Sequence, residues 1–280
     1  MIIKEFAPAK LNLCLHVTGQ RVDGYHLLDS LVAFADVGDH VVVEKSDTHA
    51  TSLTVTGPMA TGVPTDGSNL VYKAAALFPP HCATKITLHK TLPSAAGIGG
   101  GSADAAATLR AMARLWGLPL PGVDAQLSLG ADVPICMDQT PKRMQGIGQD
   151  ITAIPDMPNM AVVLANPMRP VPTGPVFHAL TQKNNPPIMG DIPQHKTPAE
   201  FAGWLEKQRN DLQPPALQTC PIVGDVLAQL AHTAPLLARM SGSGGTCFAL
   251  YETPDQATLA AQTIQSAQPG WWVRPGMLMR

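Results

Sequence analysis

The chain has 280 residues, which fits one large domain or two of ordinary size. Hydrophobic residues make up 45% and charged residues only 14%, a composition that is typical of a folded protein and argues against disorder. The formal net charge is −2, without blocks of like charge. Binding to nucleic acid through its phosphate backbone is therefore disfavoured.

The start of the chain and its cysteines predict a cytoplasmic protein. Lys4 and Glu5 interrupt the first apolar residues at once, and no run approaches the roughly 18 apolar residues of a membrane span. The 5 cysteines are widely spaced and odd in number, which fits reduced thiols better than disulfides or a zinc site. We expect no membrane and no obligate protein partner.

In the first half of the chain, short apolar segments bounded by Gly, Pro and Asp turns predict strands. They are residues 2–6, 11–18, 27–34, 40–45, 53–56 and 84–89. Helical spacing of apolar residues predicts helices at 69–78 and 102–116. For the second helix, Ser102 is the expected N-cap and Asp104 the acidic residue of the first turn.

The second half begins after a proline-rich stretch at residues 155–158. Its expected strands are 160–165, 238–240, 246–251 and 271–273, and its expected helices are 173–180, 199–208, 221–232 and 255–267. Residues 183–198 are rich in proline and lack periodicity, which predicts a surface loop. Strands and helices without regular βαβ alternation predict two α+β domains, 1–156 and 157–280, with a cleft between them.

The most informative segment is PSAAGIGGGSA, residues 93–103, which leads from a strand into a helix. Glycines let the backbone approach a ligand closely, and the helix start supplies unpaired N–H donors, so the segment predicts a phosphate site. It is neither a P-loop, which needs Lys, nor a dinucleotide fingerprint, because Ser102 stands three residues after Gly99. A plain turn is the alternative, but four glycines in five positions before a helix favour phosphate.

A second glycine cluster, SGSGG at residues 241–245, lies between two expected strands. A hairpin loop or a bulge explains it equally well. Together with the first loop, it could close a phosphate site across the cleft.

Five motifs occur in an order that resembles one family. The loop from Pro93 to Ala103 resembles that of the GHMP kinases. Within that superfamily, four further motifs resemble those of the 4-diphosphocytidyl-2-C-methyl-D-erythritol kinases. They are Pro8-Ala9-Lys10-Leu11-Asn12-Leu13, Gly19-Gln20-Arg21-Val22-Asp23-Gly24-Tyr25-His26, Gly130-Ala131-Asp132-Val133-Pro134 and Ser241-Gly242-Ser243-Gly244.

The resemblance implies a two-domain α+β GHMP kinase fold with the active site in the cleft. It implies that ATP is bound by the N-terminal domain and phosphorylates the 2-hydroxyl of 4-diphosphocytidyl-2-C-methyl-D-erythritol, on the non-mevalonate route to isoprenoid precursors. Mg²⁺ is expected with ATP; its protein ligands stay open, with Ser102 as one candidate. The alternatives are a GHMP kinase acting on homoserine or mevalonate, or a non-catalytic nucleotide-binding module.

Residue by residue, the resemblance implies that Asp132 is the catalytic base and Lys10 its charged neighbour. From the residues alone, without the resemblance, Lys10 would be interpreted as a solvated charge at the start of a strand. Asp132 would be interpreted as a loop residue that bonds its own backbone. The implied substrate-binding residues are Asn12, Tyr25, His26, Thr173 and Phe177. The implied ATP-binding residues are Pro93, Ser94, Ala95, Ala96, Gly97, Ile98, Gly99, Gly100, Gly101, Ser102 and Ala103 in the loop, with Asn69 and Lys90 beside adenine.

Overall fold

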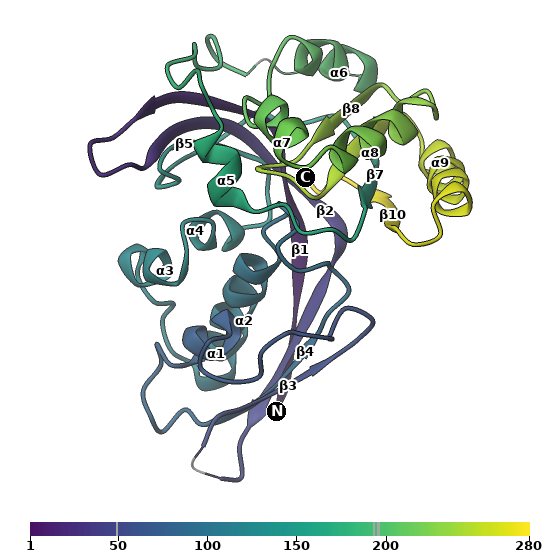
Figure 1. Ribbon diagram of the computed structural model, residues 1–280. Coiled ribbons are helices and arrows are strands. Elements are labelled where there is room, and N and C mark those ends of the chain that lie inside the picture. Colours follow the sequence, from purple (N-terminus) through teal and green to yellow (C-terminus); the bar gives the residue numbers. More distant parts are fainter. Residues whose placement is uncertain (49, 193, 195–196) are drawn as a thin grey trace. The chain divides into compact units, whose positions relative to one another are not determined.

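Two long strands, β1 (Ile2–Gln20) and β2 (His26–Lys45), begin the chain (Figure 1). The computed structural model describes residues 1–48, 50–192, 194 and 197–280. The chain forms two compact units, and each long strand contributes to both. Unit 1 comprises residues 1–9, 38–94 and 99–138, and unit 2 comprises residues 10–37, 95–98 and 139–280. These interleaved units differ from the predicted domains 1–156 and 157–280, which stay a prediction.

Both strands are longer than the sequence predicts. Segments 2–6 and 11–18 belong to one strand, and so do 27–34 and 40–45. The expected break between segments 27–34 and 40–45 is wrong, because Gly38 lies inside β2. A Cβ placed on Gly38 would lie 2.4 Å from Ala7 O. Glycine is therefore needed here for close contact between strands, not for a turn.

Unit 1 combines part of β2 with two short strands and four helices. The strand β4 (Thr84–His89) pairs in parallel with β3 (Ser52–Thr56) and antiparallel with residues 40–45 of β2. Along β4, Thr84, Ile86 and Leu88 are buried and alternate with more exposed residues, so one face of the strand packs inward. The helices are α1 (Leu70–Ala75), α2 (Gly100–Trp116), α3 (Val123–Leu129) and α4 (Val133–Cys136). The first two lie side by side (Figure 1).

Unit 2 contains a four-stranded antiparallel sheet in the order β10-β7-β9-β8. Its strands are β7 (Ala161–Asn166), β8 (Leu237–Met240), β9 (Cys247–Tyr251) and β10 (Trp272–Met277). All residues of β7 and β9 are buried, as expected for central strands covered on both faces. The strands β5 (Lys142–Gly146) and β6 (Asp150–Ala153), which the sequence does not predict, form a hairpin, and β5 also pairs with residues 28–32 of β2.

Five helices complete unit 2, and α8 and α9 contact its four-stranded sheet (Figure 1). They are α5 (Thr173–His178), α6 (Pro198–Glu206), α7 (Gln213–Thr219), α8 (Ile222–Ala231) and α9 (Pro254–Ala267). Capping boxes begin α6 and α9, where Thr197 pairs with Glu200 and Thr253 with Gln256. No helix in the described ranges has both the length and the apolar character needed to cross a membrane.

The start of α2 corrects the sequence analysis. The helix begins at Gly100, two residues earlier than expected, and its N-cap is Gly99, not Ser102. Gly99 has φ +62°, a left-handed conformation that glycine adopts without strain, and its carbonyl already accepts the N–H of Ala103 at 2.8 Å. Asp104 consequently falls outside the first turn, which contains no acidic residue.

Candidate active site

Lys10 and Asn12 lie two positions apart on β1, so their side chains share one face of the strand. Both are buried, and Lys10 Nζ donates to Asn12 Oδ1 at 2.9 Å. The backbone N–H of Lys10 donates to Ile98 O of the glycine loop, also at 2.9 Å. The alternative interpretation of Lys10 as a solvated charge is therefore wrong.

The second glycine cluster supports the first part of the glycine loop, residues 95–98. Ser241 Oγ donates to Gly97 O at 3.0 Å, and the N–H of Thr246 donates to Ala96 O at 2.9 Å. Gly97 has φ +72°, and a Cβ placed on it would lie 2.5 Å from Gly244 O. No side chain fits there. Residues 241–245 thus form the loop between β8 and β9 and also pack against the glycine loop.

The second part of the glycine loop forms the start of α2. The first N–H groups of a helix have no partner within the helix, and here no side chain caps them. They belong to Gly100, Gly101 and Ser102, so little side-chain bulk surrounds them. The helix start therefore offers backbone donors and a partial positive charge to an anion.

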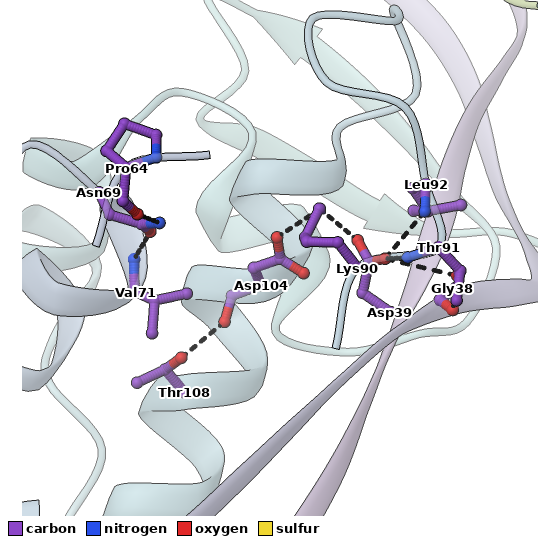
Figure 2. Close-up of polar contacts among 10 residues, drawn as sticks. All are labelled: Gly38, Asp39, Pro64, Asn69, Val71, Lys90, Thr91, Leu92, Asp104 and Thr108. Carbon is purple, nitrogen blue, oxygen red and sulfur yellow. Dashed lines mark hydrogen bonds and ion pairs between the residues drawn. The ribbon is translucent and has the colours of Figure 1, made fainter. Parts of the chain in front are cut away.

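Lys90 lies in a buried ion cluster of unit 1 (Figure 2). Its ammonium donates to Asp39 Oδ2 and, at 2.8 Å, to Asp104 Oδ2. Asp39 also accepts the N–H groups of Thr91 and Leu92, while Asp104 Oδ1 is buried without a hydrogen-bond partner. Asp104 is therefore not the dipole-stabilising residue that the sequence predicts, but part of an ion cluster that ties α2 to the end of β4.

Two carboxylates share one ammonium in this cluster, which sets their protonation. Burial and the charge of Asp39 raise the pKa of Asp104 to about 7, although Lys90 works in the opposite direction. Burial lowers the pKa of Lys90, but Asp104 and Asp39 more than offset this, so it is raised overall. Lys90 therefore stays charged, whereas the carboxyl group of Asp104 titrates near neutral pH.

Asn69, the other residue expected beside adenine, is the N-cap of α1 (Figure 2). Its Oδ1 accepts the N–H of Val71 at 2.9 Å, and its Nδ2 donates to Pro64 O at 2.7 Å. Both ends of the amide are thus engaged within the chain. Contacts of Asn69 and Lys90 with adenine stay a prediction.

His26 and Phe177 come together although 151 positions separate them in the sequence (177 − 26). Their ring centroids lie 4.8 Å apart, with an angle of 31° between the planes. His26 Nε2 is buried without a hydrogen-bond partner, and burial together with the charge of Lys183 lowers the pKa of this imidazole. Tyr25, in the turn before β2, is 63% exposed and so is not a core residue.

The remaining predicted residues begin two short helices. Thr173 is the first residue of α5, and its Oγ1 lies 2.8 Å from Ser243 Oγ of the second glycine cluster. Asp132 is the N-cap residue of α4, but its side chain makes no capping hydrogen bond. Its catalytic role stays a prediction.

Sequence reasoning missed two residues that contact the predicted ones. Asp39 meets Lys90, and Ser30 meets Asn12, where Asn12 Nδ2 donates to Ser30 Oγ at 2.8 Å. Both missed residues lie on β2, outside every motif. No local signal marks them, because Asp39 stands between Gly38 and His40 and Ser30 directly follows Asp29.

Comparisons with known proteins connect this geometry to a family. Residues 69–144 match the GHMP kinases N terminal domain, and residues 192–269 match the GHMP kinases C terminal domain. The chain is 53% identical over 280 residues to 4-diphosphocytidyl-2-C-methyl-D-erythritol kinase of Dinoroseobacter shibae, covering 99% of this chain and 95% of that one. The protein of the same name from Ruegeria pomeroyi is 50% identical, with 100% of both chains covered.

The chain belongs to the 4-diphosphocytidyl-2-C-methyl-D-erythritol kinase family. A crystal structure of 4-(cytidine 5'-diphospho)-2C-methyl-D-erythritol kinase, 30% identical, superposes with a TM-score of 0.78 and covers 99% of this chain and 100% of its own. A homoserine kinase from Cytophaga hutchinsonii has a TM-score of 0.69 at 19% identity over 98% of this chain and 94% of its own, which shows a shared fold alone. The predicted family, GHMP kinase fold and enzyme class, an ATP-dependent kinase, are confirmed.

Proposed function

We propose that this chain transfers the γ-phosphoryl group of ATP to the 2-hydroxyl of 4-diphosphocytidyl-2-C-methyl-D-erythritol, a step toward isoprenoid precursors. Full-length similarity to curated kinases of that name carries the proposal. The GHMP kinases acting on homoserine or mevalonate are disfavoured, because the homoserine kinase shares the fold at low identity. We expect the chain to act in the cytoplasm on these two small molecules, without nucleic acid, membrane or obligate protein partner.

The pair of His26 and Phe177 supports a cytosine-binding role. An aromatic face stacks on a base for about 1–3 kcal/mol, and Tyr25 presents a second, exposed ring in the same unit. His26 Nε2 lacks a partner within the chain, so it is available to the polar edge of a base. Asn12 and Thr173 are the proposed polar contacts of the acceptor, and the Asn12 amide also contacts Lys10 and Ser30.

The glycine loop supports binding of the ATP phosphates. Positive φ at Gly97 and Gly99 turns the backbone without side chains, and the uncapped start of α2 follows directly. Anions bind at such helix starts because the N–H groups and the helix dipole both favour negative charge. Lys90 is engaged by two carboxylates, so it does not supply the positive charge for the phosphates.

For the transfer itself, we assign Asp132 as the base and Lys10 as the cation. The carboxylate accepts the proton of the attacking hydroxyl, and the ammonium neutralises charge on the transferring phosphoryl group. The hydrogen bond from the Lys10 backbone to Ile98 O supports this role, because it holds the lysine beside the glycine loop that we propose for the ATP phosphates.

The described residues, 1–48, 50–192, 194 and 197–280, contain no group of three or more His, Cys, Asp or Glu side chains suited to a metal ion. Asp104, the acidic residue near the glycine loop, is committed to Lys90. The donors present therefore fit a Mg²⁺ ion that is held mainly by phosphate oxygens and water, with the Ser102 hydroxyl as the candidate protein ligand. Such an ion neutralises phosphate charge when bound.

The decisive experiment measures ADP formation with four acceptor conditions. The chain is incubated with ATP and Mg²⁺ together with 4-diphosphocytidyl-2-C-methyl-D-erythritol, homoserine, mevalonate or no acceptor. We expect ADP formation above the background rate with the first acceptor alone, and phosphorus NMR should locate the new phosphate on the 2-hydroxyl. Equal turnover with homoserine or mevalonate, or ATP binding without turnover, would contradict the proposal.

A further inference from the structure

The side-chain amide of Asn12 has one orientation that satisfies both of its neighbours. The ammonium of Lys10 can only donate, and its Nζ lies 2.9 Å from Asn12 Oδ1. On the other side, Ser30 Oγ lies 2.8 Å from Asn12 Nδ2. All three side chains are buried, so bulk water does not replace a lost partner.

Ser30 favours the same orientation of the Asn12 amide as Lys10 does, from the other end of the amide. A serine hydroxyl has one proton, and that of Ser30 is donated to Cys14 O, 2.6 Å away. Its oxygen can then only accept, so Asn12 turns its NH₂ group toward Ser30 and its carbonyl oxygen toward Lys10. A reversed amide would put NH₂ against the ammonium and would leave one buried acceptor, Cys14 O or Asn12 Oδ1, without a donor.

The backbone of Asn12 is fixed by the same kind of arrangement. Its N–H donates to Ser241 Oγ at 3.1 Å, and Ser241 Oγ in turn donates to Gly97 O at 3.0 Å. With the backbone of Asn12 held against the glycine loop, only its side chain can still rotate. The hydrogen bond to Ser30 restricts that rotation.

We propose that Ser30 is a positioning residue for phosphoryl transfer, which holds the Lys10 ammonium in place through the Asn12 amide. The inference rests on the proposed function, in which Lys10 neutralises charge on the transferring group. Ser30 acts on the rate of the chemical step, because a displaced cation stabilises the transition state less. It does not act on the affinity for ATP.

The test compares Ser30→Ala with the wild-type chain in steady-state assays with ATP and 4-diphosphocytidyl-2-C-methyl-D-erythritol. Without the hydroxyl, Asn12 Nδ2 loses its acceptor and the side chain can rotate away from Lys10, so we expect kcat to fall about ten- to a hundredfold, as displacements of about 1 Å do elsewhere. The KM for ATP should change by less than about threefold. Ser30→Cys keeps only a weak donor and acceptor, so its kcat should fall by more than about twofold but by less than that of Ser30→Ala, and this variant is used if Ser30→Ala does not fold.

Thr84 of β4 provides a matched control. Its buried hydroxyl also donates to a carbonyl, Cys82 O at 2.8 Å, and accepts from a side chain, Trp116 Nε1 at 3.1 Å. Thr84→Val should lower the melting temperature, as Ser30→Ala does, yet keep kcat within about twofold of the wild type. In an Asn12→Ala background, Ser30→Ala should cost no further kcat, because no amide remains to be oriented.

Two results overturn the inference while the proposed function stands: a kcat for folded Ser30→Ala or Ser30→Cys within about twofold of the wild type, or a loss that adds fully to that of Asn12→Ala. A wild-type chain that does not phosphorylate this acceptor overturns the proposed function, and the inference with it. A rise in KM with unchanged kcat would make Ser30 a binding residue instead and also overturns the inference.

Discussion

Lys10 and Lys90 are both buried, and the sequence predicts both as site residues, but they contact different kinds of side chain. Lys90 donates to two buried carboxylates of unit 1, Asp39 and Asp104. In unit 2, Lys10 donates to the amide oxygen of Asn12, and its backbone N–H donates to the glycine loop. The difference teaches that two lysines of similar burial can have different roles: Lys90 ties α2 to the end of β4, whereas Lys10 is the cation that we propose for the transfer.

The strongest test of this contrast removes the two groups proposed for catalysis. Asp132→Asn keeps the size of the side chain but removes its basicity, so kcat should fall by about 10²–10⁴-fold while substrate affinities change little. Lys10→Met should also lower kcat severely. The double variant should cost much less than the product of the two losses, because residues that act together are not additive. Steady-state kinetics measures all three variants.

A loss below about tenfold for Asp132→Asn would mean that this carboxylate mainly positions the hydroxyl, since a loose phosphoryl transition state needs little help from a base. Thermal melts of each variant verify that it is folded.

The second test removes Lys90. Lys90→Met leaves Asp39 and Asp104 buried without their cation, so the free energy of unfolding should fall by about 3–5 kcal/mol. The matched control is Lys85→Met, because Lys85 also pairs with a carboxylate, Asp47 at 3.0 Å, but on the surface. That variant should lose less than about 1 kcal/mol. Urea denaturation measures both, and equal losses would contradict the structural role of Lys90.

The third test concerns the acceptor site, which shares unit 2 with Lys10. Tyr25→Ala removes an exposed ring, so acceptor binding should weaken by about 1–3 kcal/mol, roughly five- to 150-fold, while stability hardly changes. Isothermal titration with each substrate measures the effect. An equal loss of ATP affinity would show that Tyr25 does not belong to a cytosine site.

The last test concerns the pH dependence of stability. The pKa of Asp104 is about 7 in the folded chain, because of burial and the charge of Asp39, against about 3.9 when unfolded. The folded chain therefore binds a proton that the unfolded chain releases, so this group makes the free energy of unfolding fall as pH rises from about 4 to about 7. Asp104→Asn should flatten that dependence.

The control for this pH effect is Asp47→Asn, because Asp47 pairs with a lysine while remaining exposed. Its denaturation curves at several pH values should follow those of the wild type. If Asp104→Asn also followed the wild type, the raised pKa of Asp104 would be wrong.

The sequence by itself determined the elements whose signals are local. The alternation in residues 84–89 and the helical spacing up to Trp116 predict β4 and the end of α2 correctly, because periodicity and turn residues act over a few positions. Motif order determined the family, and the glycine loop before a helix predicts a phosphate site, which stays a prediction. Within these segments, the start of α2 at Gly100 escaped prediction, because glycine is a poor helix former and its freedom at Gly99 has no sequence signature.

Only the tertiary structure decided what the site side chains meet. Lys90 finds Asp39, 51 positions away, and Asn12 finds Ser30, 18 positions away. The sequence likewise does not reveal that residues 241–245 support the glycine loop, or that His26 meets Phe177. Such partners are set by strand pairing and by burial of the elements that carry them. The physical reason is that a buried charge or amide must be satisfied by whichever residues the fold brings within hydrogen-bonding distance, and sequence spacing does not encode that distance.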